Sequence, residues 1–221
     1  MPGYSTRSEQ VSVAGYVYRL RVLSDKRQFS DPEGHGERLG MSSAQWSLFG
    51  QLWPSGRLLA QAMQRFDIGG KRILELGCGI GLASLVLQRR GADVVASDVH
   101  PLTGPFLAYN AALNALPMVH YHQLRWDRKL PALGHFDLII ASDVLHEGGQ
   151  AELLAHVVDC HAYPSAEVLI TDPGHRHSGD FSRLMAERQF SLIEERCPMD
   201  DHDVPPYRGH LLHYSRPRVS A

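Results

Sequence analysis

The chain has 221 residues, which suits one domain with at most a small appendage. Its net charge of −2 and 21% charged residues exclude a general electrostatic attraction to nucleic acid or to an anionic membrane. The polar start MPGYSTRSEQ, the lack of an apolar run near the roughly 20 residues that span a bilayer, and three scattered cysteines predict a cytoplasmic protein without disulfides.

The first third of the chain is predicted to hold a β segment, a loop and a helix. Residues 11–24 alternate imperfectly and are rich in Val and Tyr, which favours a strand or hairpin. Residues 25–43 contain Asp-Pro and several glycines and are expected to form a loop. Pro54 prevents one continuous helix through this region, and the apolar residues after Ser55 recur at helical spacing. We therefore separate an N-terminal extension, residues 1–45, from a main domain, residues 46–221.

The main domain alternates short apolar segments with helical ones. The expected strands cover residues 72–76, 93–97, 119–124, 136–142, 167–171, 190–196 and 210–214. The expected helices between them cover residues 82–90, 105–116, 152–161 and 180–188. Because strands separated by helices need crossover connections, the pattern predicts an α/β fold with a doubly wound, seven-stranded, mostly parallel sheet. The last two strands have no helix between them and are expected to pair antiparallel.

A glycine-rich turn follows the first strand of this alternating region. Gly77, Gly79 and Gly81 lie where strand 72–76 ends, and Asp98 ends the next strand about 20 residues later. Glycine permits φ > 0 and close approach of a ligand to the backbone, and the following helix offers free N–H groups. A carboxylate at the second strand end can bind both ribose hydroxyls. The pattern predicts a nucleoside-containing ligand; a turn needed only for tight packing is the alternative.

The acid Glu75, two residues before the first glycine, discriminates between two such ligands. A dinucleotide is bound by G-x-G-x-x-G, and here the third glycine comes one residue early. A carboxylate beside the turn would repel a pyrophosphate, but it suits S-adenosylmethionine, which carries an ammonium and a sulfonium. We therefore expect S-adenosylmethionine as cofactor, released as S-adenosylhomocysteine, with a dinucleotide oxidoreductase as a distant alternative.

The segment ILELGCGIGLASLVLQRRGADVVASDVHP resembles the cofactor-binding region of class I S-adenosylmethionine-dependent methyltransferases. Three more segments, WSLFGQLWPSGRLLAQ, LRWD and FDLIIASDVLHE, are similar to the family 16-like group, which includes protein lysine methyltransferases. The resemblance extends from about Trp46 to Tyr214. It implies a Rossmann-like fold and N-methylation of a protein side chain with a lysine-type acceptor. A small-molecule methyltransferase is the alternative, and a non-catalytic cofactor-binding protein is a weaker one.

The resemblance also implies roles for individual residues. Glu75 and the three glycines of the turn would line the methionine end, and Asp98 would bind the ribose. Asp143 and His146 would form the acceptor end; the group usually has D-x-x-Y or D-x-x-F there, and this chain has an imidazole in place of the ring. Trp53 would border the cofactor pocket, Trp126 would lie against the adenine face, and Asp127 would meet the adenine edge. Ser142 would lie at the end of the fourth strand, facing the methyl-transfer centre.

Three other motifs carry weaker signals. TDPGHRH at 171–177 follows the fifth strand, which is expected to place Asp172 and the basic cluster near the substrate. Neither the histidines of that motif nor DHD at 201–203, with Cys197 nearby, has a third ligand at a defined spacing, so no metal is expected. VPPY at 204–207 is interpreted as Pro-Pro turn chemistry. The expected partner is a protein or small-molecule methyl acceptor, not nucleic acid or a membrane.

Overall fold

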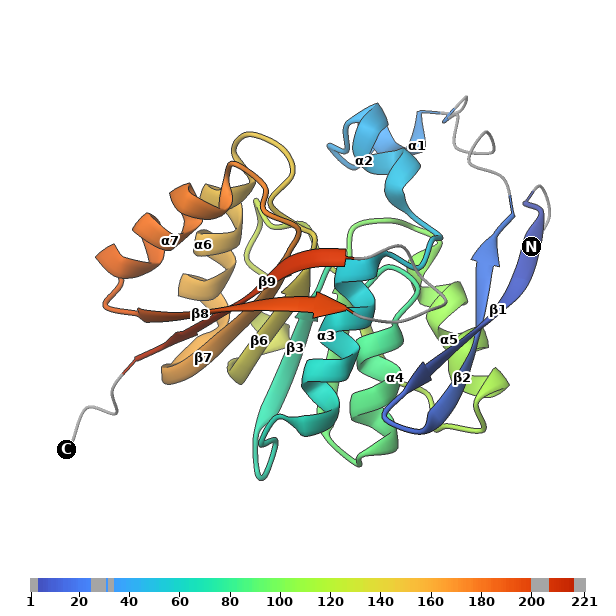
Figure 1. The fold of residues 1–221 in the computed structure, drawn as a ribbon. Coiled ribbons are helices and arrows are strands. Elements are labelled where there is room, and N and C mark those ends of the chain that lie inside the picture. Colours follow the sequence, from blue (N-terminus) through green and yellow to red (C-terminus); the bar gives the residue numbers. More distant parts are fainter. Residues whose placement is uncertain (1–3, 25–30, 32–33, 200–206, 217–221) are drawn as a thin grey trace.

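The computed structural model describes residues 4–24, 31, 34–199 and 207–216. Its centre is a seven-stranded sheet in the order β5-β4-β3-β6-β7-β9-β8 (Figure 1). The strands are β3 (Arg72–Leu76), β4 (Asp93–Asp98), β5 (His120–Gln123), β6 (Phe136–Ser142), β7 (Ala162–Asp172), β8 (Ser191–Met199) and β9 (Tyr207–Ser215). Neighbours from β5 to β7 pair in parallel, and β9 runs antiparallel to both β7 and β8. The predicted seven-stranded, mostly parallel sheet with an antiparallel C-terminal pair is confirmed.

Helices cover both faces of the sheet (Figure 1). One face carries α3 (Pro54–Arg65), α4 (Leu82–Arg89) and α5 (Thr103–Leu113), and the other carries α6 (Gln150–His161) and α7 (Ser178–Glu187). Successive strand residues point to opposite faces: Ile73 lies in the cluster under α3 to α5, and Leu74 lies in the cluster under α6 and α7. Because both of their faces are buried, the inner strands β3, β4 and β6 carry consecutive apolar residues, whereas the edge strand β5 (HYHQ) is polar and mostly exposed.

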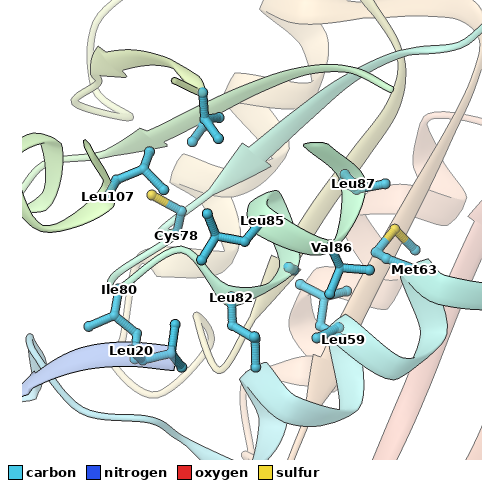
Figure 2. Close-up of a cluster of buried hydrophobic side chains, with 14 of the residues drawn as sticks. Leu20, Leu59, Met63, Cys78, Ile80, Leu82, Leu85, Val86, Leu87 and Leu107 are labelled. Carbon is cyan, nitrogen blue, oxygen red and sulfur yellow. The ribbon is translucent and has the colours of Figure 1, made fainter. Parts of the chain in front are cut away.

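The first of these clusters also incorporates the N-terminal segment (Figure 2). The segment is a hairpin of β1 (Thr6–Val13) and β2 (Tyr16–Leu23), joined by Ala14 and Gly15, which both have positive φ. Tyr18 and Leu20 of β2 are fully buried among side chains of α3, α4 and α5. The β segment predicted over 11–24 is therefore a complete hairpin, and it begins earlier, at Thr6. The prediction missed the start of β1 because residues 6–10 are too polar to be recognised as a strand in the sequence.

Residues 34–50 differ from the predicted loop over 25–43. The structure has two short helices there, α1 (His35–Arg38) and α2 (Ser43–Leu48). Ser42 caps α2 through its side chain, and the side chain of Gln45 bonds back to the Ser42 backbone. This capping box can stabilise even a short helix, and its S-x-x-Q pattern is present in the sequence. The predicted helix after Pro54 is confirmed: α3 has Pro54 at its first position and Trp53 as N-cap.

None of the helices in the described part of the chain has both the length and the apolar character needed to cross a membrane.

Candidate functional site

A cavity of about 480 Å³ lies where β3, β4 and β6 end. Residues that follow these strands line it: Gly77 to Gly79 after β3, Val99 and His100 after β4, and Asp143 and Val144 after β6. This is the switch point of the sheet, because β3 leads to β4 on one side and is bordered by β6 on the other. The segment that carries α1 and α2 supplies a further wall, with Leu39, Met41, Gln45, Leu48 and Phe49.

The glycine turn leaves open space on the cavity side. Gly77 and Gly79 both have positive φ, and both line the cavity. A Cβ added at Gly79 would meet no atom within 4 Å, so a ligand can approach the backbone there. Gly81, by contrast, does not line the cavity: it is the N-cap of α4 with a φ of 84°. Its role is to let α4 begin close to α5, because an added Cβ would lie 2.3 Å from Cδ1 of Leu107.

The Gly81→Ala variant is therefore expected to be less stable than wild type by about 2–4 kcal/mol, from the left-handed φ and from overpacking against the buried Leu107 (Figure 2). Urea unfolding monitored by circular dichroism measures this loss. Gly91→Ala is the matched control: Gly91 has a φ of 73°, but no atom lies within 4 Å of an added Cβ, so only about 1 kcal/mol is expected. Equal losses in the two variants would show that the contact with Leu107 is not the reason for glycine at 81.

Glu75 lies on β3 at the cavity wall and is only 3% exposed. The hydroxyl of Ser84, in the first turn of α4, donates a hydrogen bond to Oε2 of Glu75. Burial raises the pKa of Glu75 to about 7, and the charge of Asp98 adds to this. No lysine or arginine of the described ranges pairs with Glu75 or Asp98. This part of the cavity wall is complementary to a positively charged ligand, because neither acid has a cationic partner among the described residues and Arg125, which also lines the cavity, pairs with Asp127.

Asp98, at the end of β4, connects the glycine turn after β3 to the loop after β4. Its Oδ2 accepts a hydrogen bond from the backbone N–H of Gly79 at 2.9 Å, and its Oδ1 accepts one from the N–H of His100 at 2.8 Å. Loss of surrounding water raises the pKa of Asp98, although these N–H donors oppose the shift. Asp98 lines the cavity, and because each carboxylate oxygen can accept more than one hydrogen bond, it can also accept from the hydroxyls of a ribose.

The two predicted tryptophans line the cavity, and Asp127 does so with its carboxylate already paired. Trp53 donates a hydrogen bond from Nε1 to the carbonyl of Leu48 at 3.0 Å, which ties the start of α3 to the end of α2. Trp126 follows β5 and packs against the cluster under α6 and α7. Arg125 binds both oxygens of Asp127, at 2.9 and 2.7 Å, and this bidentate pair lowers the pKa of Asp127.

The end of β6 brings the predicted acceptor residues together. Ser142 is the last residue of the strand, and Asp143 follows with a φ of 57°, a left-handed conformation that aspartate tolerates better than most residues. His146 folds back onto this turn: its Nδ1 lies 3.1 Å from the carbonyl oxygen of Asp143, and its Nε2 lies 3.4 Å from Nε2 of Gln150. Since a carbonyl only accepts and an amide nitrogen only donates, these contacts fit a ring that donates from Nδ1 and accepts at Nε2.

Sequence reasoning missed several residues that hold the site. His175 was expected near the substrate only as part of a basic cluster, and its contact with Asp143, at 2.6 Å between Nε2 and Oδ1, was not predicted. Asn110 is fully buried in α5, donates to the carbonyl of Ile80 in the glycine turn and accepts from the N–H of Arg21 in β2. An asparagine in the apolar stretch 103–113 was the available signal. Asn110 thereby ties the glycine turn to the N-terminal hairpin.

Two motifs of the sequence cannot be placed. The run Asp201–Asp203 lies outside the described residues, and so does VPPY, except for the backbone of Tyr207, with which β9 begins. The two histidines of TDPGHRH have different partners. His175 pairs with Asp143 and lines the cavity, whereas Nδ1 of His177 lies 3.3 Å from Oδ2 of Asp180 and His177 does not line the cavity.

Comparison with known proteins places the chain in a family. The family described as lysine methyltransferase matches residues 40–187. An electron transfer flavoprotein beta subunit lysine methyltransferase from Xenopus laevis is 29% identical over 71% of this chain and 62% of its own length. Human histone-arginine methyltransferase METTL23 is 34% identical over 69% of this chain and 84% of its own length. The chain spans 28% to 62% of the length of three of the curated relatives that it matches.

A solved structure agrees with the fold. The T. thermophilus 16S rRNA N2 G1207 methyltransferase RsmC, solved with AdoMet and guanosine, has a TM-score of 0.61 and 19% identity, and the match covers 98% of this chain and 52% of that chain. The family match extends over more than half of the 221 residues and includes the glycine turn, Asp98 and Asp143. The chain therefore belongs to the lysine methyltransferase family, a family 16-like group of the class I S-adenosylmethionine-dependent methyltransferases.

Proposed function

We propose that this protein transfers a methyl group from S-adenosylmethionine to a nitrogen of a protein side chain, with lysine as the acceptor. One observation carries the proposal: Glu75 and Asp98 stand without a cationic partner among the described residues, on the wall of a cavity that also holds the Asp143 turn. A positively charged nucleoside and an amine acceptor both fit such a cavity.

The cofactor side supports S-adenosylmethionine. When bound, S-adenosylmethionine supplies a methyl group on a sulfonium, which the lone pair of an acceptor nitrogen displaces in line while the electron pair of the broken C–S bond stays on sulfur. Glu75 would face its cationic methionine end, Gly77 and Gly79 would leave room for it, and Asp98 would bind the ribose hydroxyls. Trp126 would cover the adenine face, and Asp127 its edge.

The acceptor side supports an amine. An acceptor ammonium would be attracted by the Asp143 carboxylate and would release one proton to solvent, because only a neutral amine has a lone pair for attack. Asp143 then accepts a hydrogen bond from the amine and orients it, and His146 contributes to the wall of the channel. Asp143 and His146 are thus the residues that we assign to the acceptor end, and Ser142, which precedes Asp143 and lines the same cavity, we assign to the cofactor.

The matches that extend over most of the chain favour a protein acceptor over a small molecule. The Xenopus laevis relative and METTL21A of Danio rerio, 26% identical over 79% of this chain, are both named as lysine methyltransferases. Arginine is the second candidate, because METTL23, matched over 84% of its length, is named as a histone-arginine methyltransferase. The three free cysteines, Cys78, Cys160 and Cys197, support a reducing compartment, for which we propose the cytoplasm.

The cofactor assignment is tested by thermal shift. S-adenosylmethionine and S-adenosylhomocysteine, at about 100 times their Kd, are each expected to stabilise the protein by about 2.7 kcal/mol, and NAD is not. The Asp98→Ala variant should lose the shift with both sulfur ligands while it keeps its circular dichroism spectrum. A stabilisation by NAD, or none by either sulfur ligand, would contradict the proposal.

The acceptor is tested by transfer of tritiated methyl groups from S-adenosylmethionine. The purified protein is incubated with a protein extract and, separately, with a small-molecule extract of cells that lack it. Label in protein, located on lysine by mass spectrometry of the labelled peptides, is the expected result. Label on arginine would replace lysine by the second candidate, and label only in the small-molecule extract would refute a protein acceptor.

A further inference from the structure

We propose that His175 is a positioning residue of the acceptor end: its imidazole holds the Asp143 carboxylate in the orientation that aligns the acceptor nitrogen. The inference rests on the proposed function and adds to it a residue from a different strand end. Nε2 of His175 lies 2.6 Å from Oδ1 of Asp143, and both residues line the cavity. A hydrogen bond of this length to a carboxylate is of the strong, charge-assisted kind.

The backbone that carries His175 is rigidly held. Asp172, the last residue of β7, is 1% exposed, and its Oδ1 accepts hydrogen bonds from the N–H groups of Gly174 at 2.7 Å and of His175 at 2.6 Å. On the other side, the hydroxyl of Ser178 donates to the carbonyl of His175 at 2.7 Å. The loop after β7 is thus a fixed support, and a ring mounted on it can set the direction of a neighbouring side chain.

The Asp143 carboxylate needs such a support. Its backbone is fixed, because the N–H of Asp143 donates to the carbonyl of Thr171 at 2.9 Å. Its side chain has one anchor: Oδ1 meets His175, and Oδ2 has no hydrogen-bond partner within the part of the chain that the structure describes. Oδ2 is therefore available to an acceptor nitrogen, provided that the bond from His175 keeps the carboxylate from rotating.

His146 does not provide this support. Its two ring nitrogens are directed at the carbonyl of Asp143 and at Gln150, not at the carboxylate. The ring centroids of His146 and His175 are 6.1 Å apart and their planes are tilted by 60°, so the two imidazoles are neighbours that bond different atoms of Asp143. His146 therefore stabilises the Asp143 turn, and His175 orients the Asp143 carboxylate.

The test compares His175→Ala with His175→Gln. Glutamine presents an N–H donor at nearly the reach of Nε2 of histidine but does not titrate, whereas alanine removes the donor. With the main labelled protein of the extract experiment as substrate, His175→Ala is expected to lower kcat about 100-fold, because the acceptor is misaligned. His175→Gln should recover at least about tenfold of that loss. The Kd for S-adenosylmethionine, measured by calorimetry, should stay unchanged in both variants.

His177→Ala is the control from the same loop, since His177 pairs with Asp180 and does not line the cavity. Its kcat should equal that of wild type. If His175→Ala keeps wild-type kcat, or if His175→Gln is as impaired as His175→Ala, the inference is wrong while the proposed function stands.

A second measurement keeps the inference separate from the proposed function. In ¹⁵N NMR spectra of the histidine rings, the Nε2–H signal of His175 should lie downfield in wild type and move back in Asp143→Gly, which has no side-chain acceptor at this position. Its persistence in that variant would overturn the pairing in solution. An inactive wild-type protein with a downfield signal that depends on Asp143 would refute the proposed function, and with it the positioning role, and leave only the pairing.

Discussion

Replacing Glu75 by glutamine should stabilise the ligand-free protein above pH 7 and, in the same molecule, weaken the binding of S-adenosylmethionine. Glu75 is buried, and its pKa rises from an ordinary 4.5 to about 7 in the folded state. The folded protein therefore binds more protons than the unfolded chain between these values, and the stability that Glu75 contributes is lost as the pH rises through 7. At pH 8 the ionised carboxylate costs up to about 3 kcal/mol, which glutamine removes.

The expected effect of Glu75→Gln on binding is opposite to its effect on stability: the affinity for S-adenosylmethionine falls. A cationic ligand favours the ionised form of Glu75, so its binding at pH 6 should release a proton, and calorimetry in buffers of different ionisation enthalpy measures that release. The Glu75→Gln variant keeps an acceptor for the Ser84 hydroxyl but loses the charge. Its Kd for S-adenosylmethionine should rise about 10- to 100-fold, the loss of one hydrogen bond to a charged group. The proton release should vanish with it.

Melting curves of the ligand-free variant at pH 5 and pH 8 check the stability half. Glu187→Gln, which removes an exposed carboxylate from α7, is the control and should melt like wild type within the effect of one surface ion pair. If Glu75→Gln melts at the wild-type temperature at pH 8 and binds S-adenosylmethionine equally well, the cavity acid has neither the burial nor the role assigned to it.

Asp143→Asn should reduce methyl transfer to protein by about 100- to 1,000-fold and leave cofactor binding intact. Asp143 has a φ of 57°, and asparagine adopts this conformation as readily as aspartate, so the variant isolates the carboxylate charge from backbone strain. Loss of the charge removes the attraction for the acceptor amine and weakens the hydrogen bond with His175, because an amide oxygen is a weaker acceptor than a carboxylate. The rate is measured under saturating S-adenosylmethionine, and the Kd of the cofactor by calorimetry.

Asp143→Gly is the matched control for the backbone. Glycine adopts the left-handed conformation without cost, so this variant should fold at least as stably as wild type and be as inactive as Asp143→Asn. Asp180→Asn, at an exposed position of α7, should keep full activity. Wild-type transfer rates in Asp143→Asn would remove the carboxylate from the mechanism.

Much of the cofactor side follows from short-range pattern. Glu75, Gly77, Gly79 and Asp98 lie at the ends of two neighbouring strands, and parallel strands bring their carboxyl ends to one edge. Apolar runs separated by helical segments were sufficient to locate the inner strands along the chain, because a strand that is buried on both faces carries apolar residues on both. The structure also shows that Gly81, predicted with the other glycines, packs against α5 and does not line the cavity.

The sequence by itself determined the sheet, its crossover helices and the acid-flanked glycine turn, because these depend on residues near one another in the chain. Only the tertiary structure decided the contacts that orient the site. Asp143 meets His175 across 32 residues, and Asn110 joins the glycine turn to β2 across 89. Such pairs leave no periodic signal, since they arise when the sheet places separate loops side by side. The helices α1 and α2 were missed for a different reason: with four and six residues they are too short to show an apolar period, and the capping box of α2 was the local signal available for them.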